Sequence, residues 1–276
     1  MKLTFTVTQK QRLIELDASG EFTGLEFDTT EERDYSFKKI NEELVRINKQ
    51  RLQRLCNETL RPAIRNLESL LVKTLNEAGF VEVITPTTLA KGMLEKMGIN
   101  IEHPLWEQVY WIDEHTCLRP MLAPNLYYLL GRMSRGWPKP VRIFEIGQCF
   151  RKESKGAKHL SEFTMLNLVE MGIDGDPQTR LSEMAGLVMN SVRLDYRLDA
   201  EDSEVYGNTT DVMVGDLEIA SGAVGPHALD KNWNISENWA GLGFGLERLV
   251  MIKESFQNIR RAGRSLMYID GARLNI

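Results

Sequence analysis

The chain has 276 residues, of which 42% are hydrophobic and 26% are charged. These are ordinary values for an ordered globular protein of one large domain or two small ones. The net charge of −5 argues against a protein that coats nucleic acid by bulk electrostatics, although local basic surfaces can still meet phosphates.

Membrane proteins and disulfide-stabilised proteins are also disfavoured. The sequence contains no apolar run near the roughly 18 residues that a spanning helix needs, and its start lacks the apolar core of a signal peptide. Cys56, Cys117 and Cys149 are scattered, with no paired spacing that would indicate zinc or a disulfide framework. We therefore expect a soluble, cytoplasmic protein with reduced thiols and no membrane partner.

Residues 1–60 are rich in charge and read as helices, so we predict a helical N-terminal extension followed by a main domain over residues 61–276. Cations gather in two places, at Lys38, Lys39, Arg46, Lys49, Arg51, Arg54, Arg61 and Arg65, and again at Arg260, Arg261 and Arg264. On charge patterning alone, solvated helix faces and a phosphate-binding surface are equally good interpretations.

The main domain is predicted to begin with a helix and a strand. Pro62 suits the first turn of a helix, an apolar stripe follows, and Gly79 stands where a C-terminal cap would. The stripe consists of Ile64, Leu67, Leu71 and Leu75. Residues 80–86 then read as a short strand that ends at Pro86.

The remaining elements follow from apolar periodicity. Strands are predicted at residues 106–112, 118–121, 141–147, 211–214 and 216–220 and from residue 162, and helices at residues 125–133 and 179–192. Strands with short hairpins and late helices indicate an α+β fold rather than a doubly wound one. The sequence has neither a GxGxxG nor a GxxxxGKS/T loop, so neither a Rossmann nor a P-loop site is supported.

Two separate segments carry matching charged chemistry. In the first, Arg151 and Glu153 (FRKES, residues 150–154) precede the strand pattern EFTMLN at residues 162–167. In the second, glycines that permit close approach precede Arg248, which opens a helical pattern (GLGFGLERL, residues 241–249). Fixed cations of this kind suit the attack of a carboxylate on the α-phosphorus of ATP, because they offset the repulsion between two anions.

These segments resemble motifs 2 and 3 of the class II aminoacyl-tRNA synthetases. The helix, strand and proline of residues 62–86 are similar to motif 1, which builds the dimer interface in that family. The resemblance implies a class II catalytic core, an antiparallel β-sheet flanked by helices, in a homodimer. It also implies ATP as a substrate together with Mg²⁺, and tRNA as a partner.

The resemblance further implies roles at the ATP site. Arg151 would contact the α-phosphate and the amino-acid carboxylate, whereas Arg248 would meet the γ-phosphate and stack on the adenine. Phe163 would cover the other face of the base, and Glu153 would orient it. The remaining positions expected at ATP are Glu218 and Ser221, which resemble the family's Mg²⁺-holding residues, and His159 and Leu160, although an ordinary loop histidine explains His159 equally well.

More detailed matches point to one family. Residues 118–127, 149–154, 162–167, 239–248 and 262–271 closely resemble the pyrrolysyl-tRNA synthetases, and the resemblance covers roughly residues 25–276. It implies a pyrrolysine–tRNA ligase, which forms pyrrolysyl-adenylate and transfers the amino acid to the 3′ end of tRNA(Pyl) for amber-codon decoding. The match omits the N-terminal tRNA-binding domain that some members carry. We therefore expect a stand-alone catalytic protein, whose partner domain is a separate polypeptide or absent.

The same resemblance assigns an amino-acid pocket. Pyrrolysine is a lysine acylated on its side-chain nitrogen by a methylpyrroline ring, so it needs a deep apolar pocket with a few polar groups. Asn167 would hydrogen-bond the side-chain amide, and Tyr206, on a mobile hairpin, would close over the ring and bond its imine nitrogen. The other members of this set are Ala123, Leu126, Tyr127, Leu130, Val169, Ala223, Trp239 and Gly241. Without the resemblance, hydrophobic core is the better interpretation of the apolar members.

Two other functions stay open beside the ligase. One is a synthetase-like binding or regulatory protein that does not aminoacylate, although the intact set of Arg151, Glu153, Glu218 and Arg248 argues against it. The other is a synthetase redirected to a related lysine derivative, because Val169 and Ala223 lie where pocket shape varies within the family.

Overall fold

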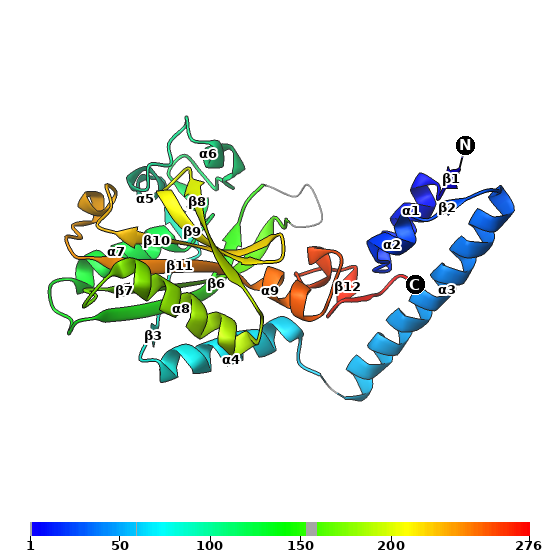
Figure 1. Ribbon diagram of the computed structural model, residues 1–276. Helices are drawn as coiled ribbons and strands as arrows, with labels where there is room; N and C mark the ends of the chain where they lie inside the picture. The colour runs from blue at the N-terminus through cyan, green and yellow to red at the C-terminus, as the bar shows by residue number, and fades with distance from the viewer. Residues whose placement is uncertain (1, 59, 153–158) are drawn as a thin grey trace. The chain divides into compact units, whose positions relative to one another are not determined.

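The chain divides into two compact units. The computed structural model describes residues 2–58, 60–152 and 159–276. Unit 1 comprises the described residues of Met1–Arg65, Lys155–Leu160 and Glu247–Ile276, and unit 2 those of Asn66–Ser154 and Ser161–Leu246. Both chain termini therefore belong to unit 1 (Figure 1). The predicted boundary at residue 60 between extension and main domain stays a prediction.

Unit 2 is built on a seven-stranded sheet. In spatial order its strands are β3 (Val81–Glu82), β6 (Val141–Phe150), β7 (Glu162–Met171), β11 (Trp239–Gly245), β10 (Leu217–Gly225), β9 (Gly207–Val214) and β8 (Arg197–Ser203). All neighbouring pairs are antiparallel except β3 and β6, which are parallel. The predicted α+β class with a largely antiparallel sheet is therefore confirmed.

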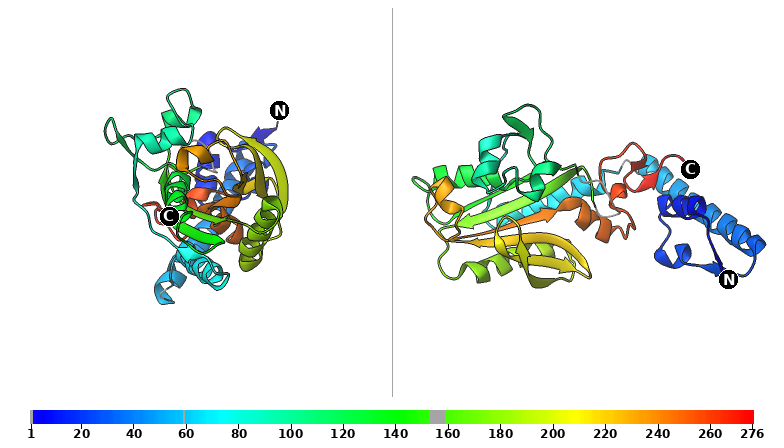
Figure 2. Two further views of the ribbon diagram at one scale, coloured as in Figure 1. Left: turned by 90° about the vertical axis from the view of Figure 1, so that its left-hand side faces the viewer. Right: turned by 90° about the horizontal axis from the view of Figure 1, so that it is seen from above.

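Helices cover both faces of this sheet (Figures 1 and 2). On one face, α8 (Pro177–Val192) packs so closely on β10 that a methyl group at Gly222 would lie 2.9 Å from Cδ1 of Leu181. Against the other face, one hydrophobic cluster joins strand residues to three helices. These helices are α5 (Lys91–Lys96), α6 (Pro104–Gln108) and α7 (Ala123–Met133), and the small pair β4 (Thr88–Ala90) and β5 (Thr116–Leu118) lies beside them in the same cluster.

Most of the predicted elements are present. The helix after Pro62 is α4 (Ala63–Glu77), with Leu67, Leu71 and Leu75 buried, and Gly79, predicted as a C-terminal cap, has a φ of +83°. Helices α7 and α8 and strands β6, β7, β9 and β10 overlap their predicted segments. Long apolar patterns with clear period were therefore sufficient to locate these elements.

Three predicted strands need correction. Residues 106–112 do not form a strand, because Pro104 begins helix α6 and Nδ1 of His103 caps it by accepting from the Leu105 N–H at 3.1 Å. The segment at residues 118–121 is wrong beyond Leu118, since β5 ends there and Arg119 turns into a buried polar network. The strand at residues 80–86 shortens to β3, because the backbone N–H of Thr85 donates to the side chain of Glu145 at 3.2 Å instead of to the backbone of β6.

Unit 1 contains the predicted N-terminal helices. They are α1 (Val7–Glu15), α2 (Gly20–Thr23) and α3 (Thr30–Asn57), together with the short strands β1 (Leu3–Thr4) and β2 (Glu26–Phe27). Phe5, Leu13, Leu16, Phe27 and Leu44 form a small core of their own, and the last residue, Ile276, packs against it. Within the described part of the chain, no helix combines the length and apolar character that crossing a membrane requires.

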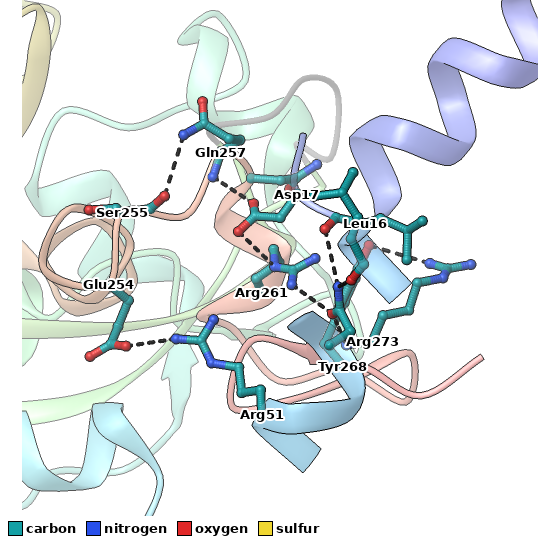
Figure 3. Close-up of polar contacts among 12 residues, drawn as sticks. Leu16, Asp17, Arg51, Glu254, Ser255, Gln257, Arg261, Tyr268 and Arg273 are labelled. Atoms are coloured by element: carbon teal, nitrogen blue, oxygen red, sulfur yellow. Dashed lines mark hydrogen bonds and ion pairs between the residues drawn. The ribbon is translucent and has the colours of Figure 1, made fainter. Parts of the chain in front are cut away.

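The C-terminal segment completes unit 1. It consists of α9 (Leu246–Lys253), a 3-10 turn η2 (Ile259–Arg261) and the strands β12 (Tyr268–Ile269) and β13 (Ala272–Arg273). Arg261 is 3% exposed, and its Nη1 and Nη2 donate to the carbonyl of Glu15 and to Oδ1 of Asn48, both at 3.0 Å (Figure 3). The chain's two ends are thus joined by buried polar contacts.

This burial corrects part of the predicted basic surface. Arg261 also lies 3.4 Å from the carboxylate of Asp17, and burial lowers the pKa of its guanidinium. Half-buried Arg51 pairs with Glu254 at 2.9 Å and stacks on Phe256. A sequence cannot separate such internal arginines from exposed ones by charge alone, so Arg261 is removed from the candidate phosphate-binding set.

We expect Arg261→Ala to destabilise the protein by about 3 kcal/mol, because the buried polar partners of the guanidinium would lose their donors. Urea unfolding followed by circular dichroism measures this change. Arg260→Ala is the matched control, because the side chain of Arg260 is exposed. Ion pairs of exposed charges contribute less than about 1 kcal/mol to stability. Equal stability losses in the two variants would contradict the proposed role of the buried contacts.

Candidate active site

The register of three central strands brings the predicted amino-acid residues onto one face of the sheet. Val169 on β7 lies opposite Gly241 on β11, and Gly241 lies opposite Ala223 on β10. The next row on the same face places Asn167 opposite Gly243, and Gly243 opposite Ser221. Because cross-strand partners share a face and side chains alternate along a strand, these two rows form one continuous surface.

Burial changes along this surface. Trp239, Val169 and Ala223 are 4%, 6% and 7% exposed, whereas Asn167 and Ser221 in the following row are half-buried. Gly241 and Gly243 stand at the centre of the two rows, so the residues of β11 directly opposite Val169 and Asn167 have no side chain. A methyl group at Gly243 would lie only 3.0 Å from Oδ1 of Asn167. The surface therefore runs from a deep apolar end to a more open polar end.

Aromatic side chains form the deep apolar end. Tyr127 on α7 meets the ring of Trp239 edge to face at 5.6 Å and stacks on Trp233 at 5.7 Å, and Tyr206 lies 6.3 Å from Trp239. Tyr206 belongs to the turn between β8 and β9, as predicted for a hairpin residue. Burial raises the pKa of both tyrosines, so their hydroxyls stay protonated at neutral pH.

The other predicted apolar residues join this aromatic group. Leu126, Tyr127, Leu130, Val169, Ala223 and Trp239 are buried in one hydrophobic cluster, and Ala123 and Tyr206 pack against it. A methyl group at Gly241 would lie 3.5 Å from the Trp239 ring and 3.6 Å from Val169. The structure thus brings together every predicted amino-acid residue of this apolar set.

Three polar atoms within this region lack hydrogen-bond partners among the described residues. They are Oδ1 of Asn167, the hydroxyl of Tyr127 and Nε1 of Trp233. A buried polar atom without a hydrogen bond costs on the order of 1–3 kcal/mol, and such atoms indicate a position that an external partner completes. An amide and a hydroxyl facing an apolar cluster suit a ligand that is largely apolar but carries an amide.

A buried ionic network anchors the start of α7, and sequence reasoning missed it. Arg119 donates from Nη1 to Glu145 at 2.8 Å, and the two side chains are 3% and 2% exposed. Thr85 donates to Glu145 at 2.7 Å, and Asn125 donates to Thr85 at the same distance. The sequence signal that could have revealed it is Glu145, an acid at an apolar position of the predicted strand at residues 141–147. A buried acid requires a partner.

The same network touches the segment that carries Arg151. The backbone N–H of Phe150 donates to the carbonyl of Arg119 at 3.0 Å, and Nε of Arg151 donates to the carbonyl of Pro120 at 2.9 Å. The guanidinium of Arg151 also lies over the ring of Phe163 at 5.4 Å. Arg151 and Phe163, two of the predicted ATP residues, are therefore neighbours. A backbone carbonyl fixes the Nε end of the Arg151 side chain.

A β-bulge places the two predicted metal-holding residues on one face. Glu218 and Ser221 are three apart, so a regular strand would direct them to opposite faces. The register shifts between Glu218 and Ala220, so that Glu218 lies opposite Met213 and Ser221 opposite Asp211. Met213 and Asp211 are two apart on β9 and share a face, and their partners therefore share it as well.

The oxygen donors at this position are Glu218 and Ser221 on β10, with Asp211 opposite Ser221 on β9. Among the residues that the structure describes, no group of three or more histidine, cysteine, aspartate or glutamate side chains is placed to hold a metal ion. One carboxylate and one hydroxyl nevertheless suit Mg²⁺, which retains waters and takes further oxygens from a substrate's phosphates. The pair therefore fits a phosphate-bound Mg²⁺ better than a permanently bound metal.

The remaining predicted ATP residues belong to other parts of the chain. Glu153 lies outside the described residues. Leu160 and Arg248 belong to unit 1, where a methyl group at Gly263 would lie 2.6 Å from Cδ1 of Leu160. Arg248 is half-buried in α9, and His159 is half-buried beside Leu160.

Comparison with known proteins identifies relatives over the whole chain. The family described as tRNA synthetases class II core domain (F) matches residues 33–269. A crystal structure of pyrrolysyl-tRNA synthetase from Desulfitobacterium hafniense is 51% identical in sequence, with 99% of both chains covered and a TM-score of 0.93. A second structure of a pyrrolysyl-tRNA synthetase from the same organism is 50% identical, covers 99% of this chain and 96% of its own, and has a TM-score of 0.91.

Curated relatives are more distant. The O-phosphoserine–tRNA(Cys) ligase of Methanococcus aeolicus is 28% identical over 62% of this chain and 34% of its own length. The phenylalanine–tRNA ligase alpha subunit of Prochlorococcus marinus subsp. pastoris is 27% identical over 60% of this chain and 52% of its own. The chain thus spans between about a third and a half of the length of the curated relatives it matches.

Proposed function

Since this chain belongs to the pyrrolysyl-tRNA synthetase family of class II aminoacyl-tRNA synthetases, we propose that it joins pyrrolysine to tRNA(Pyl). In the first step the amino acid reacts with ATP to form the adenylate and pyrophosphate. In the second step the amino acid passes to the 3′ end of the tRNA, which then supports amber-codon decoding. Both steps proceed through charge on phosphorus or a carbonyl oxygen, so preorganised donors are the main requirement.

The observation that supports this substrate best is the unpartnered amide oxygen of Asn167 beside an aromatic cluster. Pyrrolysine carries a side-chain amide N–H, which the Asn167 oxygen would accept, and a ring that would fill the apolar end between Tyr127, Val169 and Trp239. Tyr206 would cover the ring and donate its hydroxyl to the imine nitrogen. None of the residues assigned to the pocket is itself an acid that would recruit the ammonium of free lysine.

The proposed adenylation site uses cations from the class II motifs. Arg151 would hold the α-phosphate and the amino-acid carboxylate together, and its contacts to Pro120 and Phe163 support a fixed orientation. Phe163 would stack on adenine, and Glu153 would orient the base. For Arg248, opposite the γ-phosphate, and for His159 and Leu160, the motifs alone support a place at ATP.

Glu218 and Ser221 would hold Mg²⁺ against the ATP phosphates, as their shared face and oxygen donors support. When bound, Mg²⁺ offsets phosphate charge during displacement. The protein's own contribution is to present one carboxylate and one hydroxyl side by side on β10.

We also propose a homodimer and a bound tRNA. The dimer rests on the helix α4, strand β3 and Pro86, the elements of motif 1, beside which Ile84 is 92% exposed. The tRNA surface rests on exposed cations of unit 1, namely Lys38, Lys39, Arg46, Lys49, Arg54, Arg61, Arg65, Arg260 and Arg264. A separate polypeptide of the N-terminal tRNA-binding type would be an additional partner.

Replacing Arg151 or Arg248 with alanine should slow pyrophosphate exchange by about 10²–10³-fold, because each would supply charge stabilisation in the transition state. The control is Arg197→Ala, which removes an exposed arginine paired with Asp199 on β8. Circular dichroism should show all three variants folded. A variant with near-normal exchange would remove its residue from the mechanism.

Asn167→Ala should raise the KM for pyrrolysine by the equivalent of about 1–3 kcal/mol, because the substrate amide would lose its partner. The same truncation should open space for bulky aromatic amino acids. Steady-state exchange with pyrrolysine and phenylalanine measures both effects, and Asn190→Ala on the exposed side of α8 is the control. Unchanged pyrrolysine kinetics would place the amide elsewhere.

Neutralising Lys38, Lys39 and Lys49 together with glutamine should weaken tRNA binding and flatten its dependence on the logarithm of salt concentration. The reason is that a protein with fewer phosphate contacts releases fewer counterions from the tRNA when it binds. Adenylate formation should persist, because these exposed side chains lie on α3. Lys73→Gln on α4 is the control, and an unchanged salt slope in the triple variant would show that these lysines only face solvent.

One experiment separates the competing functions. The experiment measures pyrophosphate exchange with pyrrolysine, free lysine and several acylated lysines. Activity with pyrrolysine would support the proposed ligase. Preference for another lysine derivative would indicate a redirected synthetase, and inactivity with all of them would indicate a binding or regulatory protein.

A further inference from the structure

A buried carboxylate beside the proposed amino-acid pocket takes no part in the reaction described above. Asp230, the first residue of the 3-10 turn η1 (Asp230–Trp233), is 4% exposed. Its two oxygens accept from Nε1 of Trp239 at 3.1 and 3.0 Å, and Oδ2 also accepts from the backbone N–H of His227 at 2.6 Å. Burying a carboxylate is costly, and these donors offset the cost.

The contact fixes the orientation of Trp239. Its indole has a single polar atom, and turning the ring over would leave this N–H without an acceptor and take one of two donors from the Asp230 carboxylate. The ring lies directly against Gly225, where a methyl group would overlap it. Its other neighbours are Tyr127 and Tyr206. The position of Trp239 therefore decides how much space lies between the two tyrosines.

A second arm of the network reaches Tyr206. Nδ1 of His227 accepts from the Leu229 N–H at 3.1 Å, so the ring proton is on Nε2 and donates to the carbonyl of Tyr206 at 3.1 Å. The two rings also meet edge to face at 5.7 Å. Since Asp230 holds the His227 backbone, it is linked to the turn between β8 and β9.

We propose that Asp230 is a positioning residue that sets amino-acid specificity, by holding Trp239 against Gly225 and, through His227, holding Tyr206 over the pocket. This inference rests on the proposed function, because it takes Trp239 and Tyr206 as pocket walls. Asp230 acts through the walls of the pocket and does not touch the reacting phosphate. Its loss therefore affects amino-acid binding and leaves ATP binding unchanged.

The test measures pyrophosphate exchange in Asp230→Asn, which preserves the side chain's shape, and in Asp230→Ala. The KM for pyrrolysine rises about tenfold in the alanine variant and less in the asparagine variant, which retains one acceptor. The KM for ATP stays within about twofold, and acylated lysines with bulkier rings gain relative to pyrrolysine. Asn232→Ala is the matched control, because it removes a contact of the same turn, to the Lys96 carbonyl at 2.9 Å, without touching Trp239 or Tyr206.

A double-mutant cycle with Trp239→Phe tests the route of the effect. Phenylalanine removes the indole donor, so Asp230→Asn has a much smaller effect in that background than in the wild type. Additive effects, equal rises in both KM values, or unchanged pyrrolysine kinetics in folded Asp230→Asn would each overturn the inference. Wild-type protein that is inactive with pyrrolysine would instead refute the proposed function, so the two failures are distinguishable.

Discussion

The register of β7, β11 and β10 is the constraint on which the proposed chemistry depends. It aligns Val169, Gly241 and Ala223 in one row and Asn167, Gly243 and Ser221 in the next. A slip of one residue on any strand would turn its members to the other face, toward α8. The apolar pattern on that other face, including Leu242 and Leu168, fixes the register, since both side chains are buried there. Packing on one side of the sheet therefore aligns the functional residues on the other.

The sequence was sufficient to predict the elements of this region and the residues that contribute to the proposed pocket. The apolar period located β6, β7 and α8, and the motifs identified the residues that the register brings together. The bulge on β10 could not be predicted, because an extra residue in a strand leaves no apolar signature. It nevertheless determines that Glu218 and Ser221 share a face. The short helix α6 was missed for a related reason, since Pro104 and the cap from His103 outweigh its strand-like pattern.

Charge was the least readable property of the sequence. Arg119 and Arg261 look like surface cations, yet they are each 3% exposed and satisfy buried acceptors in their own units. Arg119 joins Glu145, Thr85 and the start of α7, so an ion pair in the core fixes a helix that carries Tyr127. An arginine's partners come from distant segments, such as Thr85 or Asn48, and only the tertiary structure shows them.

These networks divide the proposed pocket into parts with different tolerance to change. Tyr127 lies on a helix anchored by Arg119 and Asn125, and Trp239 is oriented by Asp230, so their positions depend on buried polar contacts. Val169 and Ala223 make only apolar contacts through their side chains. They flank Gly241, which has no side chain. Changing their size costs packing free energy alone, whereas moving the aromatic rings also breaks hydrogen bonds. Selection for a different lysine derivative would therefore act first on Val169 and Ala223, and the aromatic frame would persist.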